Sequence, residues 1–260
     1  MEVYGIKTPV IRSGDDMISI TVESCKRQGL EIKKRDILVF SAKAIGMSEG
    51  RLVDIKKIKP SEEALEISRK YRLDPGFAEV ILKESDSILG GVDYALSTIK
   101  KGVLIANGGA DQSNAPSGFV ALWPENPQKA ADDMRAAFRK LDLEVGILII
   151  DSRTLPLRMG NSAVAIGVSG FSPVDDLRGR ADLFGRSMKI KRLAVADDLA
   201  CAAQLVMGET SESTPVALIR GAPVTYGDGY NIDAAFISQE ECLIMHLLKK
   251  SDPENSHLPP

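Results

Sequence analysis

The sequence predicts an α+β fold, in which strands and helices are mixed without strict alternation. Apolar runs of strand length occupy residues 36–41, 102–106 and 145–150, and short runs rich in branched apolar residues are typical of buried strands. Segments with apolar residues at helical spacing lie between them. Because the order does not repeat a β-α unit, a mixed sheet is favoured over a doubly wound parallel sheet.

The first part of the chain predicts a strand at 3–6, a helix, a strand at 36–41 and two further helices. The sequence Ser13-Gly14-Asp15-Asp16 is typical of a helix start, because short polar side chains satisfy free backbone amides there. Residues 60–63, Pro-Ser-Glu-Glu, open the second helix in the same way. Residues 75–85 have apolar positions on one face and predict the third.

The remaining elements follow from the same patterns. The expected order is a helix at 127–141, a strand of small apolar residues at 162–169, a polar loop at 171–186, an Ala-rich helix at 199–207, a strand at 215–220 and a helix at 239–249. The pattern of apolar, small and polar residues changes in the middle of the chain, and this change predicts two domains. Residues 1–100 and 190–250 form a larger α/β domain, residues 101–189 form a smaller inserted domain, and residues 251–260 form a flexible tail.

The amino-acid composition argues against two classes of protein, nucleic-acid-binding and membrane-spanning. The chain has 260 residues, 44% of them hydrophobic, and a net charge of −3, so no basic surface indicates a nucleic-acid partner. No apolar run reaches membrane-spanning length, and no leader is evident at the N-terminus. The 3 cysteines are widely spaced and form no CxxC pair. These features predict a cytoplasmic protein with structural thiols.

Three acidic residues stand out because each follows an apolar run and lies in a turn marked by Gly or Ser. They are Asp111, Asp151 and Glu209. A carboxylate at the end of a buried strand costs free energy unless it is paired, hydrogen-bonded or bound to a metal. With few His and Cys residues available, the set predicts an all-oxygen site for Mg²⁺ or Mn²⁺. The alternative is that each residue only caps a turn or a helix.

Several short segments, taken in order, resemble the coenzyme F420-0:L-glutamate ligase family over nearly the whole chain. They include Thr8-Pro9-Val10-Ile11, the turn from Asn107 to Asn114, Asp151-Ser152 and Met207-Gly208-Glu209. Each segment alone is a weak signal, whereas their order and spacing together indicate the superfamily.

The resemblance implies a ligase that uses GTP and two Mg²⁺ or Mn²⁺ ions to add L-glutamate, as γ-glutamyl amides, to the F420 precursor. It places the metal ligands at Asp111, Asp151, Ser152 and Glu209, and the catalytic residues at Asp111, Asp151 and Arg158. It places the nucleotide contacts at Thr8, Pro9, Val10, Ile11, Asn114, Met207, Gly208, Glu209 and Thr210, to which Lys43 is added as a nearby cation. It also implies a two-domain unit that forms an intertwined homodimer.

The chain departs from the family pattern at two places. Met47 stands where the family has a Lys that contacts the nucleotide, and Lys43 is the nearest substitute. Thr154-Leu155 replaces a Gly-Arg pair, while Arg158 is retained and Arg153 lies nearby.

Two alternatives therefore stay open: a ligase of the same fold with a different carboxylate acceptor, and a nucleotide- or deazaflavin-binding module without ligase activity. Trp123, the only tryptophan, is interpreted as packing a loop.

Overall fold

The computed structural model describes residues 1–246 and is built around a five-stranded mixed sheet. The strand order is β1 (Glu2–Ile6), β12 (Val216–Arg220), β2 (Ile37–Ser41), β8 (Gly146–Thr154) and β9 (Asn161–Ser169). Strands β2 and β8 are parallel, and the other neighbours are antiparallel. This parallel pair brings the ends of β2 and β8 to the same edge of the sheet.

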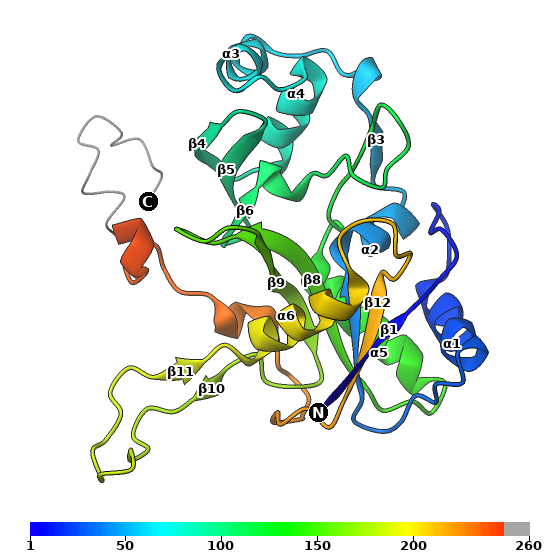
Figure 1. The fold of residues 1–260 in the computed structure, drawn as a ribbon, viewed down its shortest axis with the longest axis vertical. Coiled ribbons are helices and arrows are strands. Elements are labelled where there is room, and N and C mark those ends of the chain that lie inside the picture. The colour runs from blue at the N-terminus through cyan, green and yellow to red at the C-terminus, as the bar shows by residue number, and fades with distance from the viewer. Residues whose placement is uncertain (247–260) are drawn as a thin grey trace.

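Helices cover both faces of this sheet (Figure 1), which explains its continuous apolar strands. Leu38 and Phe40 of β2 pack in one core with residues of α1 (Met17–Arg27) and α5 (Pro127–Arg139). Ile37 and Val39 face the other way and pack in a second core with α6 (Val195–Met207). The short helix α2 (Ala42–Ser48) follows β2 directly.

A smaller lobe, which we call the small lobe, lies between α2 and α5 in sequence and above the large sheet in Figure 1. It contains β3 (Leu52–Asp54) paired with β7 (Phe119–Ala121), the short helix η1 (Ile55–Lys57), α3 (Glu62–Tyr71), α4 (Pro75–Glu84), and a three-stranded sheet of β4 (Ser87–Val92), β5 (Ala95–Lys100) and β6 (Val103–Ala106). Its apolar residues form a core of their own.

A long hairpin arm projects from the body of the molecule (Figure 1). Its base is the pair β10 (Asp175–Asp176) and β11 (Arg192–Leu193). Leu183, Phe184 and Ile190 on the arm are exposed. The segment after β12 contains the short helix η3 (Ile232–Ala235). No helix among residues 1–246 is long and apolar enough to cross a membrane.

The α+β class with a mixed sheet is confirmed, and most expected elements lie within a few residues of their expected bounds. Strands β8 and β9, which lie inside residues 101–189, pair in the same sheet as β1, β2 and β12. The expected division into two domains stays a prediction. The expected loop at 171–186 contains β10. The expected helix at 239–249 lies partly outside the described residues, and the tail at 251–260 lies wholly outside them.

A hydrogen-bonded cap anchors α3 to α4 and leads to a first prediction. The Ser61 hydroxyl accepts from the Ala64 amide at 3.2 Å and donates to Glu79 Oε2 at 2.6 Å. The Ser61 hydrogen bonds lower the pKa of Glu79 to about 2. We expect Ser61→Ala to destabilise the fold by about 1 kcal/mol at pH 7.

The effect should depend on pH in a defined direction. A depressed carboxyl pKa stabilises the fold above the unfolded pKa of about 4.3 and loses this effect as the pH falls toward the folded value. The difference between wild type and Ser61→Ala in urea unfolding should therefore shrink from pH 7 to pH 3, whereas Ser117→Ala, at an exposed position, should change little at either pH. An equal Ser61→Ala effect at both pH values would contradict the cap assignment.

Candidate active site

A cleft of about 270 Å³ lies where the parallel strands β2 and β8 meet three loops. Its walls come from five parts of the chain that are far apart in sequence. These parts are residues 8–11, the α2 region with Lys43 and Met47, the turn with Asp111 and Asn114, residues 150–152 of β8, and residues 207–215 after α6. All of the nucleotide-contact and metal-ligand residues expected from the sequence therefore border one cavity.

Asp111 enters the cleft from a tight turn that glycine makes possible. The preceding Gly108 and Gly109 have φ values of 61° and 68°, in the left-handed region that residues with a Cβ rarely adopt. The Asp111 carboxylate lies 2.6 Å from Lys43 Nζ and accepts from the Ser113 amide at 2.7 Å and the Ser113 hydroxyl at 2.8 Å. Burial opposes ionisation, but Lys43 and Ser113 outweigh it and lower the pKa of Asp111.

Asp151 enters the same cleft from β8 in a different environment. Its carboxylate accepts from Trp123 Nε1 at 2.5 Å and from the Ser152 amide at 2.9 Å. Burial raises the pKa of Asp151 to about 6, and the nearby negative charge of Asp111 acts in the same direction. Burial and the charge of Asp111 therefore both oppose ionisation of Asp151.

The loop after α6 closes another side of the cleft. Gly208 ends the helix with φ 74°, and the Thr8 amide donates to the Ser213 carbonyl at 3.0 Å. Asn114 Nδ2 donates to the Thr210 carbonyl at 2.7 Å, which joins the Asp111 turn to this loop. Glu209 is exposed and accepts a hydrogen bond from the Gln204 side chain. These contacts hold the expected nucleotide segments together.

The donor chemistry of the cleft fits a hard divalent cation. Asp111, Asp151, Ser152 and Glu209 offer only oxygen atoms. Three of them are carboxylates, and the charges of Asp111 and Asp151 repel each other. Across residues 1–246, no three His, Cys, Asp or Glu side chains lie close enough to form a ready-made metal cluster. Asp111 is paired with Lys43, and Glu209 is bonded to Gln204, so a cation would have to replace these partners.

Two arginines expected near the site lie apart from the cleft. Arg158 is exposed in the turn between β8 and β9 and does not line the cavity. Arg153 Nη2 forms an ion pair with Asp197 of α6 at 2.8 Å. Lys43 is thus the cation that the structure places in the cleft, whereas Arg153 is engaged elsewhere.

Trp123 is a site residue that sequence reasoning missed. The side chain is 2% exposed and donates its indole N–H to Asp151, so it does more than pack a loop. The only sequence signal is the Gly108-Gly109 pair, since a Cβ on Gly109 would lie 2.2 Å from Trp123 Nε1. Two adjacent glycines before an acidic residue indicate a close approach of another group.

Comparisons with known proteins place this geometry in a family. A family model described as F420-0:Gamma-glutamyl ligase matches residues 5–221. Proteins named Coenzyme F420:L-glutamate ligase are similar along most of their length. The Methanopyrus kandleri protein is 38% identical over 81% of this chain and 82% of its own. The Methanocaldococcus jannaschii protein is 37% identical over 93% and 96%, and the Archaeoglobus fulgidus protein is 31% identical over 96% and 98%.

Proposed function

The chain belongs to the F420-0:gamma-glutamyl ligase family, and from this premise we propose that it joins L-glutamate to a coenzyme F420 precursor through γ-glutamyl amide bonds. The observation that supports this most directly is the single cleft shared by the five segments expected to hold nucleotide and metal. Carbon–nitrogen ligation needs an activated carboxylate, because a free carboxylate has no adequate leaving group.

The proposed reaction has two steps. A carboxylate oxygen of the F420 precursor attacks the γ-phosphorus of GTP, so that GDP leaves and an acyl phosphate forms. The glutamate amine then attacks the acyl carbon, loses a proton, and expels inorganic phosphate. Positioning and neutralisation of phosphate charge are the main tasks in phosphoryl transfer.

The chain's own residues have distinct roles in this scheme. Asp111, Asp151, Ser152 and Glu209 are the residues that would hold Mg²⁺ or Mn²⁺, which supplies positive charge beside the phosphates when bound. Thr8, Pro9, Val10, Ile11, Asn114 and the loop from Met207 to Thr210 would bind GTP. Lys43 would add a second positive charge from α2. Arg158 has no contact in the cleft that would assign it a catalytic role.

The experiment that tests this function is direct. The purified protein is incubated with Mn²⁺, GTP, L-glutamate and deglutamylated F420, and the products are weighed by mass spectrometry. Addition of glutamate masses that requires GTP and Mn²⁺ would support the ligase. Mixtures that lack one component, and a mixture with ATP in place of GTP, are the controls. Absence of any added glutamate despite bound nucleotide would contradict it.

A second candidate is a ligase of the same fold with another carboxylate acceptor. The observation that favours it is the altered strand end at Thr154-Leu155, with Arg153 turned toward Asp197. Nucleotide hydrolysis or glutamate consumption with a different carboxylate, but not with the F420 precursor, would select this candidate. Nucleotide binding without turnover on any acceptor would instead select a binding module.

Lys43 provides a sharp test of the nucleotide site. Its Nζ lies 2.6 Å from Asp111 and 2.9 Å from the Ser113 carbonyl, and we propose that it approaches a phosphate when GTP binds. We expect Lys43→Met to raise the KM for GTP at least about tenfold, equivalent to 1.4 kcal/mol.

The control is Lys129→Met, which makes the same chemical change at an exposed residue paired with Asp133; it should leave the KM for GTP unchanged. Arg153→Ala should affect this KM less than Lys43→Met, because Arg153 is paired with Asp197. If Arg153→Ala has the larger effect, the roles assigned to these two cations are wrong.

We also propose that the protein forms a homodimer through the projecting arm. Leu183 is 99% exposed, Phe184 83% and Ile190 86%, and clustered exposed apolar residues favour an interface. An obligate dimer would bury more than about 2,000 Å². Sedimentation at micromolar concentration should give the mass of a dimer, and Phe184→Asp should shift it toward the monomer. A monomeric wild type would contradict the proposal.

A further inference from the structure

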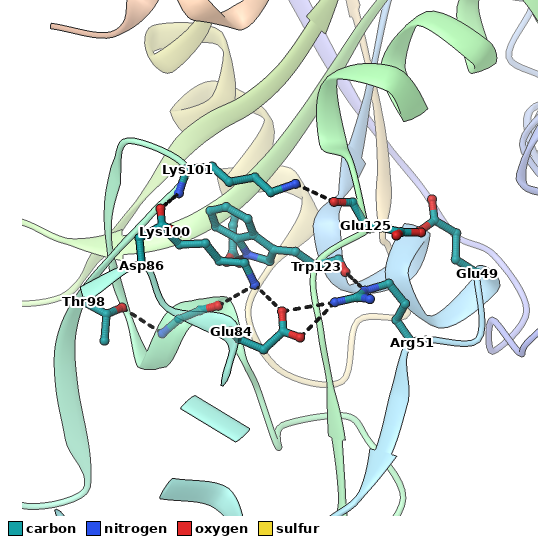
Figure 2. Close-up of polar contacts among 11 residues, drawn as sticks. Glu49, Arg51, Glu84, Asp86, Thr98, Lys100, Lys101, Trp123 and Glu125 are labelled. Carbon is teal, nitrogen blue, oxygen red and sulfur yellow. Dashed lines mark hydrogen bonds and ion pairs between the residues drawn. The ribbon is translucent and has the colours of Figure 1, made fainter. Parts of the chain in front are cut away.

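A largely buried ionic cluster lies outside the set of residues that line the cleft. Its members are Arg51, just before β3, Glu84 at the end of α4, and Lys100 at the end of β5, and we call it the Arg51–Glu84–Lys100 cluster. Figure 2 shows the three side chains meeting beside Trp123. Lys100 is 5% exposed. All three residues belong to the small lobe, whereas Asp151 belongs to the large sheet.

The cluster holds two groups, the Gly108 carbonyl and Trp123. Lys100 Nζ lies 2.6 Å from Glu84 Oε2, donates to the Gly108 carbonyl at 2.9 Å, and lies 5.0 Å from the centre of the Trp123 ring. Arg51 Nε donates to the Trp123 carbonyl at 2.6 Å, and its Nη2 donates to both Glu84 oxygens at 3.0 and 3.1 Å. Trp123 is therefore held through its backbone and its ring.

The two groups that the cluster holds lead directly to the two carboxylates of the cleft. Trp123 Nε1 donates to Asp151 at 2.5 Å, and Gly108 begins the turn that ends at Asp111. The Gly108 amide also donates to Thr98 Oγ1 at 2.8 Å, so both polar backbone atoms of Gly108 are hydrogen-bonded. Displacement of the cluster would move the indole and the turn, and with them the two carboxylates.

Stability alone is a weak explanation for such a cluster. Burial lowers the pKa of Lys100, and Glu84 opposes this effect. Desolvation of the charged Lys100 ammonium therefore costs free energy. Apolar residues of similar volume often replace buried ion pairs with no loss of stability. Directed hydrogen bonds to the Gly108 and Trp123 carbonyls, however, are something that apolar residues cannot supply.

We propose that Arg51, Glu84 and Lys100 are positioning residues that orient Asp151 and Asp111 through Trp123 and Gly108 for the divalent cation. This inference rests on the proposed metal-dependent function. It assigns a role to three charged residues that do not line the cleft. It also makes the small lobe responsible for the geometry of a carboxylate on the large sheet.

The test uses Mn²⁺ as the probe and Trp123 as the only tryptophan reporter. Binding is measured from the electron paramagnetic resonance signal of free Mn²⁺, and the indole environment from fluorescence emission. We expect Lys100→Met to weaken Mn²⁺ binding at least about tenfold and to shift the emission to longer wavelength. Lys100→Arg, which keeps a positive charge, should recover part of both.

Lys101→Met is the matched control, because it removes the same charge one residue away. Lys101 Nζ donates to the Glu125 carbonyl instead (Figure 2). It should leave Mn²⁺ binding and emission unchanged. Trp123→Phe is the second variant, in case Lys100→Met does not fold, because it removes only the indole part of the link. It should weaken Mn²⁺ binding while circular dichroism stays like that of the wild type.

The outcomes separate this inference from the proposed function. Wild-type protein that binds no Mn²⁺ would overturn both the metal-dependent function and the positioning role. Wild-type binding that Lys100→Met and Trp123→Phe leave unaltered would overturn the positioning role alone. Equal weakening by Lys100→Met and Lys101→Met would also overturn it, because the effect would then be one of net charge.

Discussion

Asp151→Asn and Asp111→Asn are each expected to abolish glutamate ligation while the fold remains intact. Each substitution removes one negative charge from a cleft that would offset several phosphate charges through the cation. Loss of one such electrostatic interaction costs about 2–4 kcal/mol in the transition state. Turnover should therefore fall by roughly two to three orders of magnitude.

The two variants should differ in stability because the carboxylates differ in environment. Burial raises the pKa of Asp151 to about 6, so the ionised form is disfavoured in the metal-free protein and Asn should be tolerated well. Asp111 is paired with Lys43 and has a lowered pKa, so Asp111→Asn should lose this ion pair. Thermal melting without metal should therefore place Asp111→Asn below Asp151→Asn.

Asp133→Asn is the matched control, since Asp133 is an exposed residue of α5 paired with Lys129. It should retain ligation and Mn²⁺ binding. If Asp111→Asn and Asp151→Asn bind Mn²⁺ and turn over like the wild type, the two carboxylates are not metal ligands, and the all-oxygen site is wrong.

Local sequence patterns were sufficient for the elements that bury apolar residues. Strand β2 and strand β8 are buried on both faces, and their continuous apolar runs were identifiable without knowledge of their partners. Strands β4 and β5 were missed, because β4 contains Gly90 and Gly91 and β5 includes polar residues, so neither shows a clear apolar run. The pairing of β2 with β8 is a contact between distant segments, which a local pattern does not reveal.

The site shows the same division between local pattern and distant contact. Acidic turns and the ordered family segments indicated which residues border the cleft, although their roles in binding remain predictions. Arg153 lies next to the altered Thr154-Leu155 pair in the sequence, but its pairing with Asp197 on α6 depends on how that helix packs. Arg51, Glu84 and Lys100 gave no warning in the sequence, because they are far apart along the chain and meet only when the small lobe packs. Trp123 meets Asp151 only where the small lobe contacts β8.

Gly109→Ala is expected to impair metal binding and ligation without removing any polar group. A Cβ at this position would lie 2.2 Å from Trp123 Nε1 and 2.5 Å from Cε2, so the indole or the turn must shift, and we expect the bond from Trp123 to Asp151 to be disturbed. The substitution also places Ala at φ +68°, which costs about 1–2 kcal/mol. A displacement of about 1 Å in a catalytic group can reduce activity about a hundredfold, and we expect a loss of this order.

Gly29→Ala is the control that separates the effect of displacing the indole from the effect of backbone strain. Gly29 has φ +67°, and a Cβ there would meet nothing within 4 Å, so this variant has the same strain without the clash. Both variants should lose similar stability from the backbone, whereas only Gly109→Ala should shift Trp123 fluorescence and weaken Mn²⁺ binding. If the two variants lower ligation equally, backbone strain alone is responsible. The contact between Gly109 and Trp123 would then have no part in holding Asp151.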